Sequence, residues 1–155
     1  MNTTDIQHKI LESLGRRVAE RNGCPLELEL LITLGSIHPW LVKTTACADK
    51  FFSMKELKEL EKYKFDLKIG TKVKFVLSLV HRVVRKEKVL IFCHNIPVVK
   101  LFLEIFEKFF GWLKGREVLV LTGELELFER GRVMDQFEEP VGASKILLAS
   151  ISACA

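Results

Sequence analysis

The stretch Lys88–Asn95, KVLIFCHN, decides the fold class. Four apolar residues follow a lysine, and the run stops abruptly on Cys-His-Asn. A short run of this kind is typical of a strand that is buried on both faces in a parallel sheet. Such strands deliver polar residues to the carboxyl edge of the sheet, where the ligands of α/β folds gather. The stretch therefore predicts an α/β fold with its chemistry directly after Phe92.

The segments on either side of this strand alternate between helical and strand patterns. In three of them apolar residues recur at helical spacing, and two further short apolar runs have the composition of strands. Helices are expected over 71–85, 97–111 and 125–138, and strands over 117–121 and 145–150. The resulting α-β-α-β-α-β order predicts a three-layer fold, a parallel sheet with helices on both faces.

The first 65 residues have helical patterns only. Residues 5–21 carry apolar side chains every three or four positions, and Gly23-Cys24-Pro25 ends that pattern. Ser53 is followed three residues later by Glu56, a capping box that predicts the start of a short helix. A helical region therefore precedes the α/β part of the chain.

Three polar strand ends are expected at the carboxyl edge of the sheet: Cys93-His94-Asn95, Thr122-Gly123-Glu124 and Ser150-Ile151-Ser152. They are expected side by side, because parallel strands all end at the same edge. A catalytic pair of Cys93 with His94 is disfavoured, because neighbours on a strand point to opposite faces. The histidines and cysteines show no ligand spacing, so no metal site is predicted.

The sequence contains no self-sufficient nucleotide triphosphatase site. Gly70-Thr71-Lys72 has only the tail of a phosphate-loop pattern, and no strand runs directly into it. No Asp-Glu pair follows an apolar strand, so the carboxylates of a magnesium site of that type are missing as well.

Two clusters have both a structural and a functional interpretation. One is a group of basic residues just before the first strand, which either form a solvated helix end or contact a ligand: Arg82, Arg85, Lys86 and Lys88. The other is an aromatic series that is either core or a stacking platform for bases: Phe102, Phe106, Phe109, Phe110 and Trp112. Helical spacing favours core for the aromatic series.

Composition and charge exclude several classes of protein. The chain has 155 residues, 48% apolar and 28% charged, which is typical of one globular domain. Its net charge of +4 is compatible with nucleic acid but far below that of a histone-like protein. No apolar run approaches the roughly 18–20 residues of a membrane span, so no membrane partner is predicted. The N-terminus also lacks the pattern of a secretory signal.

Four elements, in matching order and spacing, resemble those of one family. They are Gly70-Thr71-Lys72 leading into KVLIFCHN, Gly123 with Arg130 and Phe137 at intervals of seven, KILLASISACA over 145–155, and His38-Pro39-Trp40-Leu41 upstream. Together they resemble the second RecA-like lobe of Swi/Snf-type helicase-like ATPases, over roughly residues 5–155. The form of the last element, motif V, is most similar to the plant CLASSY branch.

The resemblance implies a domain organisation and a site. Residues 1–65 would be a helical inter-lobe region, and 66–155 part of a P-loop NTPase-type helicase C-terminal lobe that ends inside motif V. The strand tips would grip the DNA backbone without a catalytic role, through His94, Asn95, Thr122, Gly123, Ser150 and Ser152. Lys72 and Arg130 match family positions whose role would be either basic support for DNA binding or structural. Phe137 matches a position whose role would be packing. Cys154-Ala155 departs from the Gly-Gly of many relatives, which puts a close approach to the backbone in doubt.

The resemblance also implies what the parent protein does. It would be an ATP-dependent DNA translocase and chromatin remodeller of the nucleus, acting in RNA-directed DNA methylation and siRNA-linked gene silencing. ATP and Mg²⁺ would be bound by the full-length parent with the first RecA-like lobe, and this chain alone would bind no cofactor and hydrolyse nothing. Its partners would be double-stranded DNA or chromatin and a plant RNA polymerase complex. The chain is thus expected to be a fragment, truncated at its C-terminus. The alternative is a non-motor scaffold that recruits a polymerase or chromatin factors.

Overall fold

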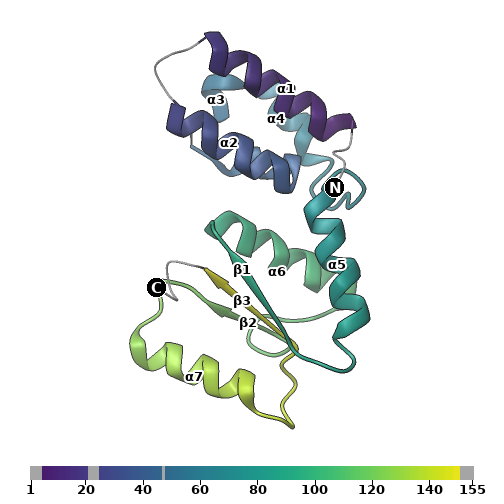
Figure 1. The fold of residues 1–155 in the computed structure, drawn as a ribbon, viewed down its shortest axis with the longest axis vertical. Coiled ribbons are helices and arrows are strands. Elements are labelled where there is room, and N and C mark those ends of the chain that lie inside the picture. The colour runs from purple at the N-terminus through teal and green to yellow at the C-terminus, as the bar shows by residue number, and fades with distance from the viewer. Residues whose placement is uncertain (1–4, 21–24, 47, 151–155) are drawn as a thin grey trace. The chain divides into compact units, whose positions relative to one another are not determined.

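The computed structural model describes residues 5–20, 25–46 and 48–150 (Figure 1). The chain divides into two compact units, Met1–Ser78 (unit 1) and Leu79–Ala155 (unit 2). Helix α5 (Thr71–Val83) begins in unit 1 and ends in unit 2. The sequence-based domain division after residue 65 stays a prediction.

Unit 1 is helical, as its sequence pattern predicts. Before α5 it contains α1 (Asp5–Glu20), α2 (Pro25–Ile37), η1 (Pro39–Thr44), α3 (Ala48–Phe51) and α4 (Met54–Glu61). Its core brings together buried side chains from four of these segments and the turn after α3: Leu14, Leu31, Val42, Phe51 and Phe52. The capping box at the start of α4 is confirmed, with Ser53 and Glu56 each bonding the other's backbone N–H.

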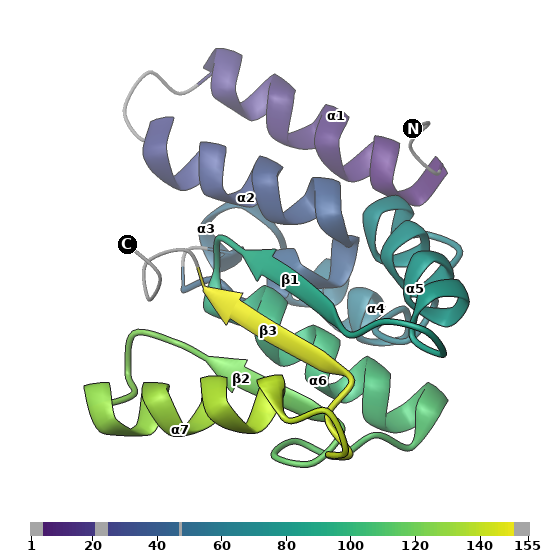
Figure 2. The same cartoon turned by 60° about the horizontal axis from the view of Figure 1, so that its bottom comes forward.

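Unit 2 is built around a three-stranded parallel sheet. The strands are β1 (Val89–Cys93), β2 (Val118–Leu121) and β3 (Ile146–Ser150), in the order β1-β3-β2. Helices α6 (Ile96–Phe110) and α7 (Leu127–Glu138) lie on opposite faces of the sheet (Figure 2). The predicted alternation is confirmed, with element ends shifted by at most two residues.

The connections of unit 2 use the residues that their geometry requires. Pro97 lies in the first turn of α6, where its missing N–H costs no helical hydrogen bond. Gly111 ends α6 at φ +70°, a left-handed conformation that favours glycine. The chain then turns back through Leu113–Arg116 into β2.

The sheet is covered unevenly within the described residues. All five residues of β3 are buried, as expected for a central parallel strand. Helix α7 packs over β2 and β3 through Val133 and Phe137, and Leu125, just before the helix, packs against the same cluster. On the same face of β1, however, Leu90 and Phe92 are 47% and 54% exposed. The prediction that β1 is buried on both faces is therefore wrong, because α7 lies over the β2 side of the sheet and leaves Leu90 and Phe92 of β1 exposed.

Candidate nucleic-acid interface

The three strand tips lie side by side at the carboxyl edge of the sheet, as predicted. Cys93 at the end of β1 pairs in register with Ser150 at the end of β3. Leu121 at the end of β2 pairs with Ala149, so Thr122 follows at the level of Ser150. The parallel register therefore brings together residues that are up to 57 positions apart in the sequence.

The residues at this edge differ in exposure. His94 and Gly123 are exposed, whereas Thr122 and Ser150 are buried to 9% and 1% exposure. Asn95 is half-buried and precedes α6, but its side chain makes no capping hydrogen bond to that helix. The edge thus presents imidazole, amide and backbone groups to a ligand, with a hydroxyl layer beneath them.

Two other predicted features cannot be placed in the same way. Ser152 lies outside the described residues, and so do Cys154 and Ala155. Lys72 is exposed on α5 and belongs to unit 1, whereas the strand tips belong to unit 2. The assignment of all these residues to DNA stays a prediction.

Arg130 holds the loop that follows β2. Its Nε donates to the carbonyl of Leu125 at 2.9 Å, and its Nη2 donates to the carbonyl of Gly123 at 3.2 Å. The guanidinium therefore fixes the backbone of the Thr122–Leu125 turn, at the edge where Gly123 is exposed. Of the two roles left open for Arg130, this geometry favours the structural one. Phe137 packs against the sheet, in line with its expected packing role.

Lys88, which opens the KVLIFCHN stretch, ties the end of α7 to the sheet. Its Nζ donates to the carbonyl of Phe137, to the carbonyl of Glu139 at 2.7 Å and to the hydroxyl of Ser144 at 3.2 Å. A lysine is well placed there, because the last carbonyls of a helix carry partial negative charge and have no helical partners. The sequence alone assigned Lys88 only to a basic cluster, since its acceptors are about 50 residues away.

Cys93 is unsuited to nucleophilic chemistry. It is 4% exposed, and burial raises the pKa of its thiol to about 11. The thiol therefore stays protonated at neutral pH, whereas the thiolate is the reactive form. In the part of the chain that the structure describes, no three histidine, cysteine or acidic side chains gather as metal ligands. No helix among the described residues has the length and apolar character of a membrane span.

The His38-Pro39 stretch of unit 1 is held by burial and hydrogen bonds. His38 is fully buried, and its Nδ1 accepts from the N–H of Trp40 at 3.1 Å. Its Nε2 lies 3.1 Å from the carbonyl of Asp66, which selects the tautomer with the proton on Nε2. Burial lowers the pKa of His38, partly opposed by the neighbouring Asp66. A Cβ at Gly70 would lie 2.3 Å from the imidazole Cδ2, so this position requires glycine.

A second polar tie in unit 1 involves Gln7, which is fully buried. Its Nε2 donates to the carbonyl of Gly35 at 2.9 Å, and its Oε1 accepts from the hydroxyl of Thr71 at 3.0 Å. It therefore links α1, α2 and α5 through one amide group. The sequence pattern did not single out this role, because a lone glutamine on an amphipathic helix is normally exposed.

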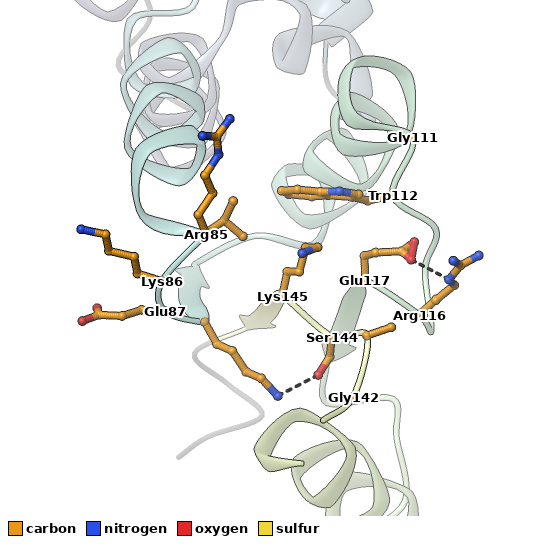
Figure 3. Close-up of a pocket in the computed structure, with 13 residues that line it drawn as sticks. Arg85, Lys86, Glu87, Gly111, Trp112, Arg116, Glu117, Gly142, Ser144 and Lys145 are labelled. Atoms are coloured by element: carbon orange, nitrogen blue, oxygen red, sulfur yellow. Dashed lines mark hydrogen bonds and ion pairs between the residues drawn. The ribbon is translucent and has the colours of Figure 1, made fainter. Parts of the chain in front are cut away.

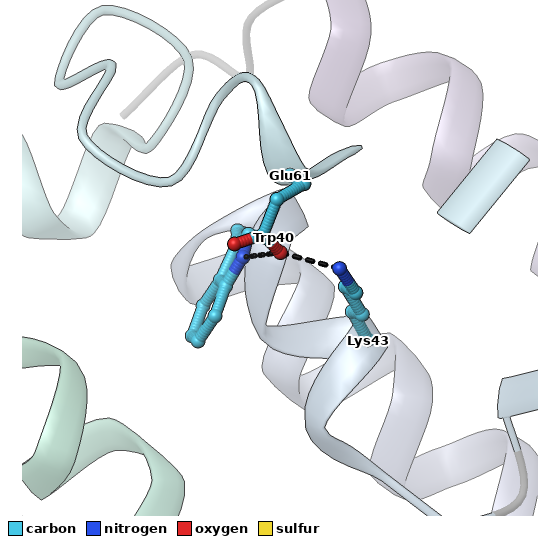
Figure 4. Close-up of polar contacts among 3 residues, drawn as sticks. All are labelled: Trp40, Lys43 and Glu61. Atoms are coloured by element: carbon cyan, nitrogen blue, oxygen red, sulfur yellow. Dashed lines mark hydrogen bonds and ion pairs between the residues drawn. The ribbon is translucent and has the colours of Figure 1, made fainter. Parts of the chain in front are cut away.

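Trp40, Lys43 and Glu61 form a polar cluster on the surface of unit 1 (Figure 4). The indole Nε1 donates to Glu61 Oε2 at 3.1 Å, and Lys43 Nζ contacts the same oxygen. Lys43 first and Trp40 second lower the pKa of Glu61. The Nζ of Lys64 lies 4.5 Å from the centre of the indole ring. Because Glu61 is exposed to solvent, the ion pair adds little stability, and the cluster mainly orients Trp40.

The fold and the family model together define the class of this protein. Residues 71–155 match the helicase conserved C-terminal domain family, and the chain belongs to that family. The C-terminal domain of the Sulfolobus solfataricus SWI2/SNF2 ATPase has the same fold, with a TM-score of 0.68 and 19% identity. That likeness covers 97% of this chain and 60% of the other. The expected RecA-like α/β fold is confirmed.

Sequence similarity narrows the class further. The chain is 64% identical over 155 residues to the SNF2 domain-containing protein CLASSY 1 of Arabidopsis thaliana, which confirms the predicted similarity to the CLASSY branch. The match covers all of this chain and 12% of that protein. The S. solfataricus SWI2/SNF2 ATPase core in complex with dsDNA also shares the fold, with a TM-score of 0.66 and 20% identity over 96% of this chain and 29% of that one.

Proposed function

We propose that the carboxyl edge of this lobe grips the backbone of double-stranded DNA as part of a SNF2-type DNA translocase. The observation that carries the proposal is the meeting of the three strand tips, with His94 and Gly123 exposed at one edge. The dsDNA complex of a SWI2/SNF2 ATPase core with the same fold supports it.

The groups at this edge suit phosphate better than bases. Backbone N–H groups, hydroxyls, amides and imidazole N–H groups all donate to phosphate oxygens. Such contacts fix the position of a protein on DNA but carry no sequence information. An enzyme that moves along DNA of any sequence needs contacts of this kind. In this proposal Arg130 and the α6 N-terminus fix the turns, while His94, Asn95, Thr122 and Gly123 make the contacts.

The described residues do not fit an ATP and magnesium site by themselves. They contain no cluster of three potential metal ligands, and the sequence has no complete phosphate-loop pattern. ATP and Mg²⁺ use, which the family membership implies, is therefore proposed for the whole protein together with its first RecA-like lobe. This chain is proposed to hold DNA and not to hydrolyse ATP alone.

The similarity to CLASSY 1 supports a finer proposal for the whole protein. We place it in the nucleus as a chromatin remodeller that acts in RNA-directed DNA methylation and siRNA-linked silencing, with a plant RNA polymerase complex among its partners.

Duplex binding by the 155-residue chain tests the proposed function. Two labelled duplexes of unrelated sequence should bind weakly and equally, with an affinity that falls steeply as salt rises. Replacing His94 and Asn95 by alanine should weaken both complexes several-fold without changing the melting of the protein, because His94 is exposed and the Asn95 side chain makes no capping hydrogen bond. Hydrolysis of ATP by residues 1–155, or a strong preference for one sequence, would contradict the proposal. If neither duplex binds, the non-motor scaffold becomes the better account.

A further inference from the structure

A pocket of about 580 Å³ lies at the amino edge of the sheet in unit 2, at the opposite ends of the strands from the candidate interface (Figure 3). Its walls are the segments that lead into the three strands, residues 84–88, 111–117 and 142–145. Neither the proposed DNA grip nor the family match assigns a role to this pocket.

The pocket has an excess of unpaired positive charge. Five of its lining residues are basic: Arg85, Lys86, Lys88, Arg116 and Lys145. Lys88 is bonded to the end of α7, and the Nε of Arg116 lies 2.8 Å from Glu117 Oε2. The side chains of Arg85 and Lys145 make no ion pair or hydrogen bond within the residues that the structure describes.

The acidic side chains of the pocket do not neutralise these two cations. Glu117 is 7% exposed, and its Oε1 accepts from the N–H of Leu113 at 3.1 Å while its Oε2 faces Arg116. Both carboxylate oxygens of Glu117 therefore contact groups of the 113–117 segment. Glu87 extends away from the pocket at the rim, next to Lys86 (Figure 3). Arg85 and Lys145 therefore leave a local positive potential that a ligand anion would satisfy.

An aromatic ring lines the same pocket as these cations. The indole of Trp112, seen edge-on in Figure 3, lines the pocket together with Arg85, Glu117 and Lys145. Trp112 stacks on Phe110, with ring centroids 4.6 Å apart and an angle of 22° between the rings, and it also packs on Phe106. These contacts hold the ring in one orientation before any ligand binds. The prediction of core is confirmed for Phe102 and Phe106, which are buried, and wrong for Phe109, which is 45% exposed, whereas Phe110 and Trp112 are half-buried.

We propose that this pocket binds a single-stranded nucleic acid, with one base stacked on Trp112 and the adjoining phosphates beside Arg85 and Lys145. An aromatic platform between cations is the arrangement by which proteins bind single strands without sequence preference. The pocket volume lies in the range of small-ligand sites, so it can take one unstacked nucleotide. Bases within a duplex are stacked on one another and cannot enter such a pocket. An acidic peptide would use the cations but would leave the indole without a planar partner.

The test uses the 155-residue chain with Trp40→Phe, which leaves Trp112 as its one tryptophan because the sequence has two. A labelled 12-nucleotide oligo(dT) is titrated into it, and both anisotropy and indole fluorescence are recorded. We expect saturable quenching of the indole with the same midpoint as the anisotropy change. A duplex of equal length should not quench. Binding without quenching, or equal quenching by the duplex, would overturn the proposal.

Variants separate the pocket from general electrostatics. Arg85→Glu with Lys145→Glu should weaken oligo(dT) binding at least about tenfold, and Trp112→Leu about tenfold. The matched control is Lys55→Glu with Lys58→Glu, the same charge change on exposed α4 residues of unit 1, which should change binding less than about threefold.

Equal losses in the charge-reversal pair and its control would overturn the proposal in favour of net charge. Poly-glutamate that displaces oligo(dT) at lower concentration than unlabelled oligo(dT) would overturn it in favour of an acidic protein partner. If Trp112→Leu fails to fold by circular dichroism, the quenching result and the charge pair still decide. Replacing His94 and Asn95 by alanine should leave the indole quenching by oligo(dT) unchanged, so failure here is distinct from failure of the DNA grip.

Discussion

The His38 stretch of unit 1 and the His94 strand tip of unit 2 resemble motifs of the same family, but their surroundings are opposite. His38 is fully buried, and both of its ring nitrogens already have backbone partners. His94 is exposed at an edge where three strands end. A motif-like residue can thus serve the fold or a ligand, and its burial and contacts distinguish the two. Of these two histidines, His94 is the one that is open to a ligand.

The variant with the largest expected effect on stability is Gly70→Ala. The added methyl would lie 2.3 Å from His38 Cδ2 inside packed surroundings, so we expect the free energy of unfolding to fall by about 3 kcal/mol. Urea denaturation in a Trp112→Phe background, which leaves Trp40 as the one tryptophan of the sequence, measures the change in unit 1 through Trp40 fluorescence. The matched control is Gly131→Ala in α7, where a Cβ meets nothing within 4 Å and helix propensity predicts a gain of up to about 1 kcal/mol. A Gly70→Ala protein as stable as the parent would show that His38 is not tightly packed.

Arg130→Ala should have the next largest effect. It removes the hydrogen bonds to the Gly123 and Leu125 carbonyls, so the free energy of unfolding should fall by about 2 kcal/mol. The rate of amide hydrogen exchange should rise more in residues 122–125 than in β2. Arg132→Ala, an exposed neighbour on α7, is the control and should change neither quantity measurably. Unchanged exchange in 122–125 would contradict the role of Arg130 as a loop clamp.

The sequence predicted the fold well because its signals are local. Apolar runs define the strands, the Ser53 capping box and Pro97 start helices, and Gly111 ends one. The central position of β3 was not predictable, since the order of strands depends on packing between distant segments. The sequence did not predict the hydrogen bonds of Lys88 to the end of α7 or the pocket at the amino edge, for the same reason. The candidate DNA edge was predictable because parallel strands must end together.

The pH dependence of unit 1 gives the smallest expected effect. Burial lowers the pKa of His38 in the folded state, so the unfolded chain binds its proton more readily. Stability from the neutral ring is therefore complete above pH 6.5, the ordinary value for histidine, and is lost as the pH falls below it. Urea denaturation of the parent between pH 7.5 and pH 5, at pH values chosen around that point, should show this loss.

The control for this prediction is His38→Gln, whose stability should vary less over the same range even though it is lower at every pH. A parent whose unfolding free energy rises as the pH falls below 6.5 would contradict the buried neutral imidazole. It would also remove the contrast between the two histidines.

Site-specific cross-linking to duplex DNA shows directly which edge of the sheet the duplex contacts. A photoreactive amino acid is placed at Glu124, exposed beside the strand tips, and in separate proteins at Lys114 near the amino edge and at Lys55 on α4. The strand-tip account predicts a cross-link to the duplex from position 124, lost in high salt, and little or none from positions 55 and 114. Cross-links from position 55 or 114 without one from position 124 would contradict the claim that the carboxyl edge of this sheet holds DNA.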